Sequence, residues 1–247
     1  MLPLNVYVEA KEKTIYLRIV SQGTNLVIAV HHLNNSRSQR ILWLLEELGL
    51  ECEIKCYERD SKTMLAPASL RKTHPLGKSP VIIDDGQTVA ESGAIVEYLV
   101  GRYGDGRLIS AVDTPERSRY TYWLHYAEGS LMPLLLLKLA FDQIEKQSMP
   151  FFVRPIARAI SGRAKSSFIA PQISLHLDYI EAELGKTEWF AGNEFTAADI
   201  QMSFPLEAAT ARAGLSTSRP KLMDFLNRIH QRPTYQKALE RGGVYEL

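Results

Sequence analysis

The sequence Lys-Ser-Pro-Val-Ile-Ile-Asp-Asp-Gly-Gln-Thr-Val-Ala-Glu-Ser at residues 78–92 decides the fold. Two short apolar runs, residues 81–83 and 88–90, flank an Asp-Gly pair, and this arrangement is a strong hairpin signal because a type I′ turn needs two residues at positive φ. A helical pattern follows at once, with apolar side chains at Ile95, Leu99 and Tyr103. The stretch therefore predicts two antiparallel strands and a helix that begins at Glu91-Ser92.

The start of this helix is a candidate binding site. A helix start carries unpaired N–H groups and a partial positive charge, which favour a carboxylate. Ser92 adds a hydroxyl, and Glu91 offers a partner for an ammonium group. Ser79 precedes a proline, so its backbone is extended and free to pair with a peptide laid beside it. These features describe a site for a small zwitterionic peptide, and a plain hairpin with a capped helix is the alternative.

A family resemblance favours the binding site. The segments His-Pro-Leu-Gly-Lys-Ser-Pro-Val-Ile (residues 74–82) and Ala-Glu-Ser-Gly-Ala-Ile (residues 90–95) resemble the glutathione-binding region of glutathione S-transferases. The resemblance implies that Pro80 is cis and that Ser79 pairs through its backbone with the cysteinyl part of glutathione. It places Glu91 and Ser92 at the γ-glutamyl end and Lys78 near the glycine carboxylate. Glutathione would be the co-substrate, and no metal is expected.

The segments before the hairpin complete an α/β half. Residues 26–30 form a continuous apolar run, which is typical of a strand buried on both faces. The next helix ends at Gly49, residues 52–57 form a second strand, and a weaker helix is predicted over residues 65–72. The order βαβαββα predicts a thioredoxin-like domain over residues 26–105. Ligands of such sheets bind at the carboxyl ends of the strands.

The second half, residues 113–247, is predicted to be an all-α domain. Thr114-Pro115-Glu116 is a helix start, and the segment from Thr196 to Asp199 matches a capping box. The resemblance covers residues from about 26 to 240. Residues 1–25 lie outside it and form an N-terminal extension, which is either an added hairpin or a tail.

Activation of the thiol is expected at the polar turn of residues 34–38. The thiol of glutathione resembles that of free cysteine, with a pKa of about 8.5, so lowering the pKa by two units needs about 2.7 kcal/mol. A hydrogen bond to a charged group contributes about 1.5–3 kcal/mol. A single hydroxyl beside a helix N-terminus therefore accounts for most of the shift.

The motif at the start of the first helix suggests which residue activates the thiol. The segment Asn-Ser-Arg-Ser-Gln-Arg-Ile-Leu-Trp (residues 35–43) resembles that of serine-type transferases from fungi and bacteria, in which the activating serine lies four residues before the arginine found here at position 40. The resemblance implies that Ser36 is catalytic, and an ordinary helix cap is the alternative role. Asn35, Ser38 and His125 are the backups. The resemblance also assigns an acceptor pocket to Tyr122, His125 and Tyr126, for which core packing is the alternative.

Composition sets limits on partners and compartment. The 247 residues carry a net charge of +1, which gives no electrostatic case for nucleic acid. No apolar run reaches the length of a membrane span, so stable membrane insertion is not expected. Cys52 and Cys56 are the two cysteines, which indicates no disulfide framework and fits a reducing cytoplasm. We expect both to be small buried side chains.

The combined prediction is a cytoplasmic glutathione transferase of detoxification, acting as a homodimer, whose glutathione thiolate attacks small hydrophobic electrophiles. Two alternatives remain open. One is a glutathione-dependent peroxidase acting on organic hydroperoxides, and the other is a non-catalytic glutathione-binding or regulatory protein of the same fold. A hydroxyl within reach of the sulfur favours an enzyme, whereas a side chain turned away favours a binding protein.

Overall fold

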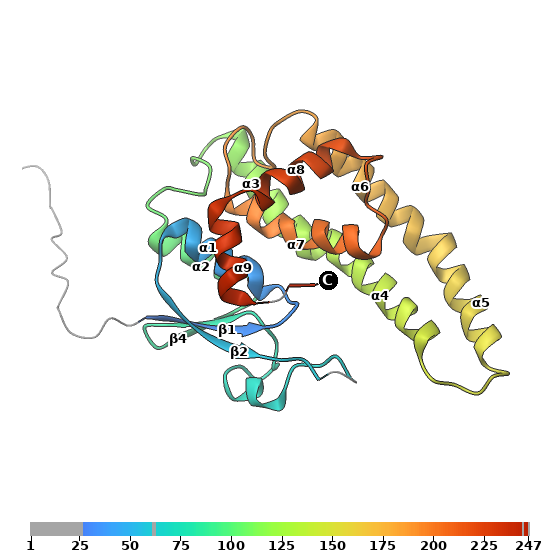
Figure 1. Ribbon diagram of the computed structural model, residues 1–247. Coiled ribbons are helices and arrows are strands. Elements are labelled where there is room, and N and C mark those ends of the chain that lie inside the picture. Colours follow the sequence, from blue (N-terminus) through green and yellow to red (C-terminus); the bar gives the residue numbers. More distant parts are fainter. Residues whose placement is uncertain (1–26, 61–62, 244, 247) are drawn as a thin grey trace, which may run out of the picture.

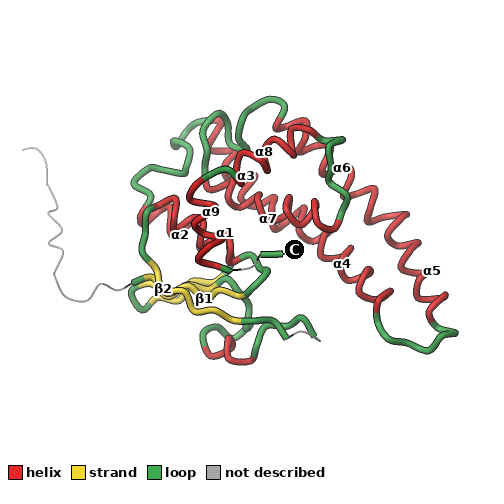
Figure 2. The backbone as a smooth tube through the Cα atoms, viewed as in Figure 1, coloured by secondary structure: helices red, strands yellow, loops and turns green. Residues whose placement is uncertain are grey.

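A computed structural model describes residues 27–60, 63–243 and 245–246 of the chain (Figure 1). Its strands gather in one part of the molecule, and helices make up the remainder (Figure 2). The predicted extension at residues 1–25 lies outside the described residues. The last helix of the first half ends at Tyr103 and the first helix of the second half begins at Pro115, so the proposed boundary between residues 105 and 113 falls between them.

The sheet has four strands in the order β2-β1-β3-β4, where β1 is Ile28–Leu33, β2 is Cys52–Tyr57, β3 is Val81–Asp84 and β4 is Gln87–Ala90. Strand β1 pairs in parallel with β2 and antiparallel with β3. The buried strand predicted over residues 26–30 is confirmed for residues 28–30, which begin the fully buried strand β1, whereas Val27 is 47% exposed and residue 26 lies outside the described residues. The burial predicted for Cys56 is wrong, since β2 is an edge strand and this side chain is exposed.

The hairpin formed by β3 and β4 has the predicted turn. Asp85 and Gly86 have φ angles of 51° and 76°, which are the two positive values that a type I′ turn needs. Helix α2, Ser92–Tyr103, follows directly after Glu91. Because Val81 pairs with Ala90 in this hairpin, the segments just before β3 and just after β4 lie side by side.

Two further helices complete the first half. Helix α1, Ser38–Leu48, ends at Gly49, whose φ of 70° is the left-handed conformation that glycine adopts readily. The weaker helix predicted over residues 65–72 is a short 3₁₀ helix, Ala68–Lys72. Pro67 immediately precedes it in an extended conformation. The observed order therefore matches βαβαββα, with a 3₁₀ turn as the second helical element.

The second half contains helices and, among its described residues, no strand, as predicted. Its helices are α3 Pro115–Tyr126, α4 Met132–Lys146, α5 Arg154–Ala164, α6 Ala170–Leu184, α7 Ala197–Arg212, α8 Pro220–His230 and α9 Pro233–Gly242. Short π-helical segments, Ala127–Leu131 and Lys165–Ile169, interrupt the helical runs α3–α4 and α5–α6. Helices α4 and α5 form a long arm that extends from the remaining helices (Figure 1).

The two halves share one continuous core that passes through α1. This helix contacts the sheet on one side and α7 and α9 on the other. Its Trp43 packs edge-on against Tyr235 of α9, with ring centroids 5.1 Å apart. The side chain of Arg40 is 1% exposed and donates to the carbonyl of Gln201 in α7. The start of α1 is therefore fixed by contacts from both halves.

Candidate functional site

The hairpin and the first turn of α2 form one wall of a cleft of about 270 Å³ between the two halves. We call it the hairpin cleft. It is lined by Arg37, His74, Leu76, Lys78, Ser79, Pro80, Ala90, Glu91, Ser92 and Glu128. All five residues predicted from the sequence to bind glutathione are present in this lining. The strand register explains this, because it places the segment around Pro80 beside the segment around Glu91.

The backbone of the cleft has two unusual features. The peptide bond between Ser79 and Pro80 is cis, as the family resemblance implied. Glu91 has φ 72° and ψ 126°, a conformation that non-glycine residues rarely adopt. Such conformations persist where the surrounding structure enforces them, and they cluster at functional sites. The strain at Glu91 therefore lies at the point where the sequence predicts ligand binding.

The cleft offers both signs of charge to a ligand. Among the described residues, neither Lys78 nor Glu91 takes part in an ion pair, and both side chains are exposed. The hydroxyl of Ser79 donates to the carbonyl of His31 at 2.8 Å, which anchors this segment to β1. Within the described part of the chain, the backbone N–H and C=O of Ser79 have no protein partner. The arrangement suits a short zwitterionic peptide in an extended conformation.

The turn before α1 holds the hydroxyls that the sequence singles out. Ser36 is 3% exposed, and its Oγ lies 2.8 Å from the Oγ of Ser38. The Oγ of Ser38 lies in turn 2.9 Å from Nδ1 of His32, and Nε2 of His32 lies 3.0 Å from the carbonyl of Gly242. These contacts form a buried Ser36–Ser38–His32 chain that ends on α9. Neither Ser36 nor Ser38 is among the described residues that line the hairpin cleft.

The acceptor at Gly242 and the burial of His32 together indicate the direction of this chain. A carbonyl oxygen only accepts, so Nε2 of His32 must donate to Gly242. Burial lowers the pKa of His32 despite that bond, so the ring is neutral and its Nδ1 accepts from Ser38. With its proton directed to His32 rather than to the carbonyl of Leu33 at 3.3 Å, Ser38 accepts from Ser36. The catalytic role of Ser36 stays a prediction, since its hydroxyl would have to leave Ser38 to donate to a thiolate.

Asn35, the first backup residue, has φ 49°, and its Oδ1 accepts from the backbone N–H of Glu246 at 2.8 Å. It therefore connects the turn to the end of the chain, and it does not line the hairpin cleft as the described residues form it.

A cluster of charged residues at the cleft was not identified from the sequence. Glu128, in the π-helical segment after α3, accepts hydrogen bonds from Nε of Arg37 at 2.9 and 3.0 Å and from Nη2 of Arg40. Burial opposes ionisation of Glu128, but the two arginines hold its pKa below the ordinary value. The Arg-x-x-Arg spacing at the start of α1 was visible in the sequence. Glu128, 91 residues further on, gave no local signal.

The predicted acceptor residues lie elsewhere. Tyr126 is buried, and its hydroxyl bonds to His176 of α6. Tyr122 packs against Tyr126 and Tyr179, and His125 is exposed. None of these three side chains lines the hairpin cleft as the described residues form it. The tyrosines face α6, so the core-packing alternative describes Tyr126, and the acceptor role of the three residues remains a prediction.

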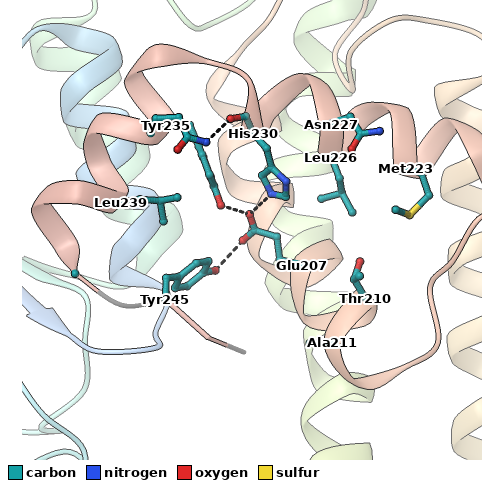
Figure 3. Close-up of a pocket in the computed structure, with 12 residues that line it drawn as sticks. Glu207, Thr210, Ala211, Met223, Leu226, Asn227, His230, Tyr235, Leu239 and Tyr245 are labelled. Atoms are coloured by element: carbon teal, nitrogen blue, oxygen red, sulfur yellow. Dashed lines mark hydrogen bonds and ion pairs between the residues drawn. The ribbon is translucent and has the colours of Figure 1, made fainter.

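A second, larger pocket of about 600 Å³ lies between α7, α8, α9 and the end of the chain (Figure 3). At its floor the carboxylate of Glu207 accepts from the hydroxyls of Tyr235 and Tyr245, each at 2.7 Å, and bonds to His230 at 3.0 Å. Figure 3 shows these three side chains converging on Glu207 from α8, α9 and the tail. This network joins the last helices to α7 and contains none of the predicted glutathione residues.

Two general findings concern metals and membranes. Within residues 27–60, 63–243 and 245–246, no three histidine, cysteine, aspartate or glutamate side chains come together as metal ligands would. None of the described helices combines the length and the apolar character that crossing a membrane requires.

Comparisons with known proteins agree with the geometry. The families described as "Glutathione S-transferase, N-terminal domain" and "Glutathione S-transferase, C-terminal domain" match residues 27–101 and 149–233. Glutathione S-transferase 3 of Schizosaccharomyces pombe is 40% identical over 216 residues, which cover 87% of this chain and 88% of the relative. Glutathione S-transferase 1 of Saccharomyces cerevisiae is 32% identical over 224 residues, or 87% and 95% of the two chains.

A solved structure extends the comparison to three dimensions. The crystal structure of a glutathione S-transferase from Actinobacillus pleuropneumoniae superposes with a TM-score of 0.72 at 32% identity. It covers 87% of this chain and 93% of the bacterial one. The similarity therefore extends over both the α/β half and the helical half.

Proposed function

The chain belongs to the glutathione S-transferase family and conjugates glutathione, and we propose that it binds this tripeptide in the hairpin cleft. The observation that carries the proposal is the arrangement of three neighbouring groups. Lys78 and Glu91 are unpaired among the described residues, and the open backbone of Ser79 shares the cleft with them. Glutathione is extended, carries charges of both signs and has a peptide backbone to pair with Ser79.

Each part of glutathione has a complementary group in the cleft. The γ-glutamyl end carries an ammonium and a carboxylate, which suit Glu91 and the N–H groups at the start of α2 with the Ser92 hydroxyl. The cysteinyl unit pairs with the backbone of Ser79 as an added strand does. The glycine carboxylate lies near Lys78. This placement directs the sulfur toward the start of α1.

The reaction is a nucleophilic displacement or addition by sulfur. The thiolate electron pair forms a bond to an electrophilic carbon of the acceptor. Where the acceptor carries a leaving group, its bond to that carbon breaks and it departs with the electron pair. The protein contributes by holding the thiol as a thiolate and by fixing its position. We propose small hydrophobic electrophiles as the acceptors.

A homodimer is proposed for the whole molecule. Phe152, Ile156 and Ile160 recur every four residues along the arm and are 65%, 60% and 63% exposed. Phe152 lies in the turn before α5, and the two isoleucines lie within that helix. Exposed apolar side chains grouped in this way mark an interaction surface, because soluble monomers rarely leave such a group uncovered. A second copy of the chain is the proposed partner, and the two arms would lie against each other.

We also propose that the protein acts in the cytoplasm. Cys52 and Cys56 are free thiols, and Cys56 is exposed. Exposed free thiols suit a reducing compartment. A fluorescent fusion that spreads evenly through the cytoplasm is the expected result, and accumulation in an organelle would contradict it.

The activity is tested by following thioether formation with glutathione and an activated aryl chloride. We expect a rate above the uncatalysed reaction that saturates with glutathione, with one chloride released per thioether formed. A parallel assay with an organic hydroperoxide detects the peroxidase alternative, in which two glutathione molecules form a disulfide while the peroxide becomes an alcohol. Tight binding of glutathione without either reaction would instead support the regulatory alternative.

A further inference from the structure

The direction of the Ser36–Ser38–His32 chain leaves the thiol of glutathione without an obvious hydroxyl donor. The hydroxyls of Ser36 and Ser38 are buried and bonded to each other, and neither serine is among the described residues that line the hairpin cleft. A thiolate needs a donor or a positive charge. The group that lines the hairpin cleft at this turn is the neighbouring side chain, Arg37.

Arg37 is held in place from one side. It is the residue before the first turn of α1, and its side chain is 34% exposed. Its Nε donates to both carboxylate oxygens of Glu128, and its guanidinium carbon lies 5.4 Å from the ring centre of Phe204. Within the described part of the chain, its two terminal NH₂ groups make no hydrogen bond. The guanidinium is therefore oriented through Nε, and no described residue occupies its two terminal NH₂ groups.

The charge at this corner also favours an anion. Two guanidinium groups, those of Arg37 and Arg40, share the single carboxylate of Glu128, which leaves a net charge of +1. Arg40 is buried and also bonds to the carbonyl of Gln201. Of the two arginines, Arg37 is the one that lines the cleft, so the excess positive charge faces the cleft at Arg37. Lys78 also lines the cleft, but there it stands beside Ser79, where the glycine carboxylate is proposed to lie.

We propose that Arg37 is the residue that holds the glutathione sulfur as a thiolate, with Glu128 as the residue that positions it. The inference rests on the proposed binding of glutathione in the hairpin cleft. On binding, the S–H bond breaks and the proton passes to bulk water, while the electron pair stays on sulfur opposite the terminal N–H groups of Arg37. That pair then forms the bond to the acceptor carbon. Ser36 and Ser38 keep the turn in shape through their chain to His32.

The test is a pH titration of the ultraviolet thiolate absorbance of glutathione bound to wild type, Arg37→Gln, Ser36→Ala and Arg163→Gln. The last variant removes an exposed arginine of α5 and is the matched charge control. We expect the bound thiol of wild type and control to have a pKa about one to two units below the free value of about 8.5. Arg37→Gln should abolish most of that shift, and Ser36→Ala should keep it.

The pH dependence of conjugation separates a catalytic role from a structural one. Arg37→Gln should lower kcat/KM about tenfold or more at pH 6.5 and much less at pH 9, where the free thiol ionises without help. An equal loss at both pH values, or a shift that survives in Arg37→Gln and disappears in Ser36→Ala, would overturn the proposal. Absence of glutathione binding in wild type would instead refute the proposed function.

A second measurement covers the case in which Arg37→Gln fails to fold. The wild-type chain labelled with ¹⁵N-arginine is titrated with glutathione bound, and Arg37→Lys identifies the resonance of Arg37. We expect the terminal nitrogens of Arg37 to shift with the same midpoint as the thiolate absorbance. A resonance that stays constant through that midpoint would contradict the assignment.

Discussion

Ser36 and Arg37 are neighbours in the sequence, yet only Arg37 reaches the hairpin cleft. The catalytic role of Ser36 stays a prediction from the family motif, whereas the proposal for Arg37 depends on partners far along the chain. His32 and Gly242, which indicate the direction of the Ser36–Ser38–His32 chain, lie 210 residues apart. Glu128, which orients Arg37, is likewise distant in sequence. By contrast, a short hairpin brings together the residues predicted to bind glutathione, so their common place in one cleft could be predicted from the sequence.

At the γ-glutamyl end, we predict that Glu91→Ala weakens glutathione binding by about 10- to 100-fold. A hydrogen bond to a charged group contributes about 1.5–3 kcal/mol, and 1.4 kcal/mol corresponds to a factor of ten in Kd. Isothermal titration calorimetry measures the change. Glu97→Ala removes an exposed carboxylate from the same helix outside the cleft and should bind like wild type. Wild-type affinity in Glu91→Ala would refute the placement.

Among the elements, the hairpin and the helix caps were predicted most reliably, because their signals are local. The turn at Asp85-Gly86 and the cap of α3 by Thr114 both formed as expected. The capping box of α7 is also present, with Asp199 fully buried. The second helix of the first half was less predictable. The sequence predicted a weaker helix over residues 65–72, and a 3₁₀ helix formed after Pro67.

The capping box yields a prediction on stability. The carboxylate of Asp199 accepts from the backbone N–H groups of Phe190 and Thr196, each at 2.8 Å, and from the Thr196 hydroxyl at 3.0 Å. Asp199→Ala leaves two buried N–H groups unsatisfied, at about 1–3 kcal/mol each. We expect the thermal midpoint to fall by about 5–15 °C, measured by circular dichroism. Asp224→Ala, which removes an exposed carboxylate of α8, is the control. An unchanged midpoint in Asp199→Ala would show that the capping assignment is wrong.

The same carboxyl yields a prediction on pH. Burial raises the pKa of Asp199 from 3.8 to about 6, although its hydrogen bonds oppose the rise. The folded state then binds the proton more tightly than the unfolded state, so this contribution to stability is complete below about pH 4 and is lost as the pH passes through 6. Denaturant unfolding of wild type and Asp199→Asn between pH 4 and 7 measures it. We expect the free energy of unfolding of wild type to fall relative to that of Asp199→Asn as the pH rises. A difference between the two proteins that does not change with pH would contradict the raised pKa.

At the scale of the whole molecule, the proposed homodimer depends on the arm. Sequence periodicity alone did not reveal the exposed apolar group, because apolar residues at helical spacing are read as core until the packing is known. Phe152, Ile156 and Ile160 have that spacing and remain exposed. The assignment of a second copy as partner therefore combines the family expectation with an uncovered surface.

We predict that the double variant Ile156→Asp, Ile160→Asp shifts the protein from dimer to monomer while its fold remains intact. Charged side chains would be buried without partners in the interface, which disfavours association. Light scattering after size exclusion reports the mass, and circular dichroism checks the fold. Val112→Asp, at an exposed apolar residue between α2 and α3, is the control and should stay dimeric. A wild-type chain that is monomeric at micromolar concentration would contradict the proposal.

The most direct test of the central claim is a crystal structure of the chain with reduced glutathione. We predict electron density for the tripeptide in the hairpin cleft, paired with the backbone of Ser79, with its γ-glutamyl end at Glu91 and its sulfur facing the terminal nitrogens of Arg37. Density in the pocket around Glu207, with the hairpin cleft left empty, would contradict the account.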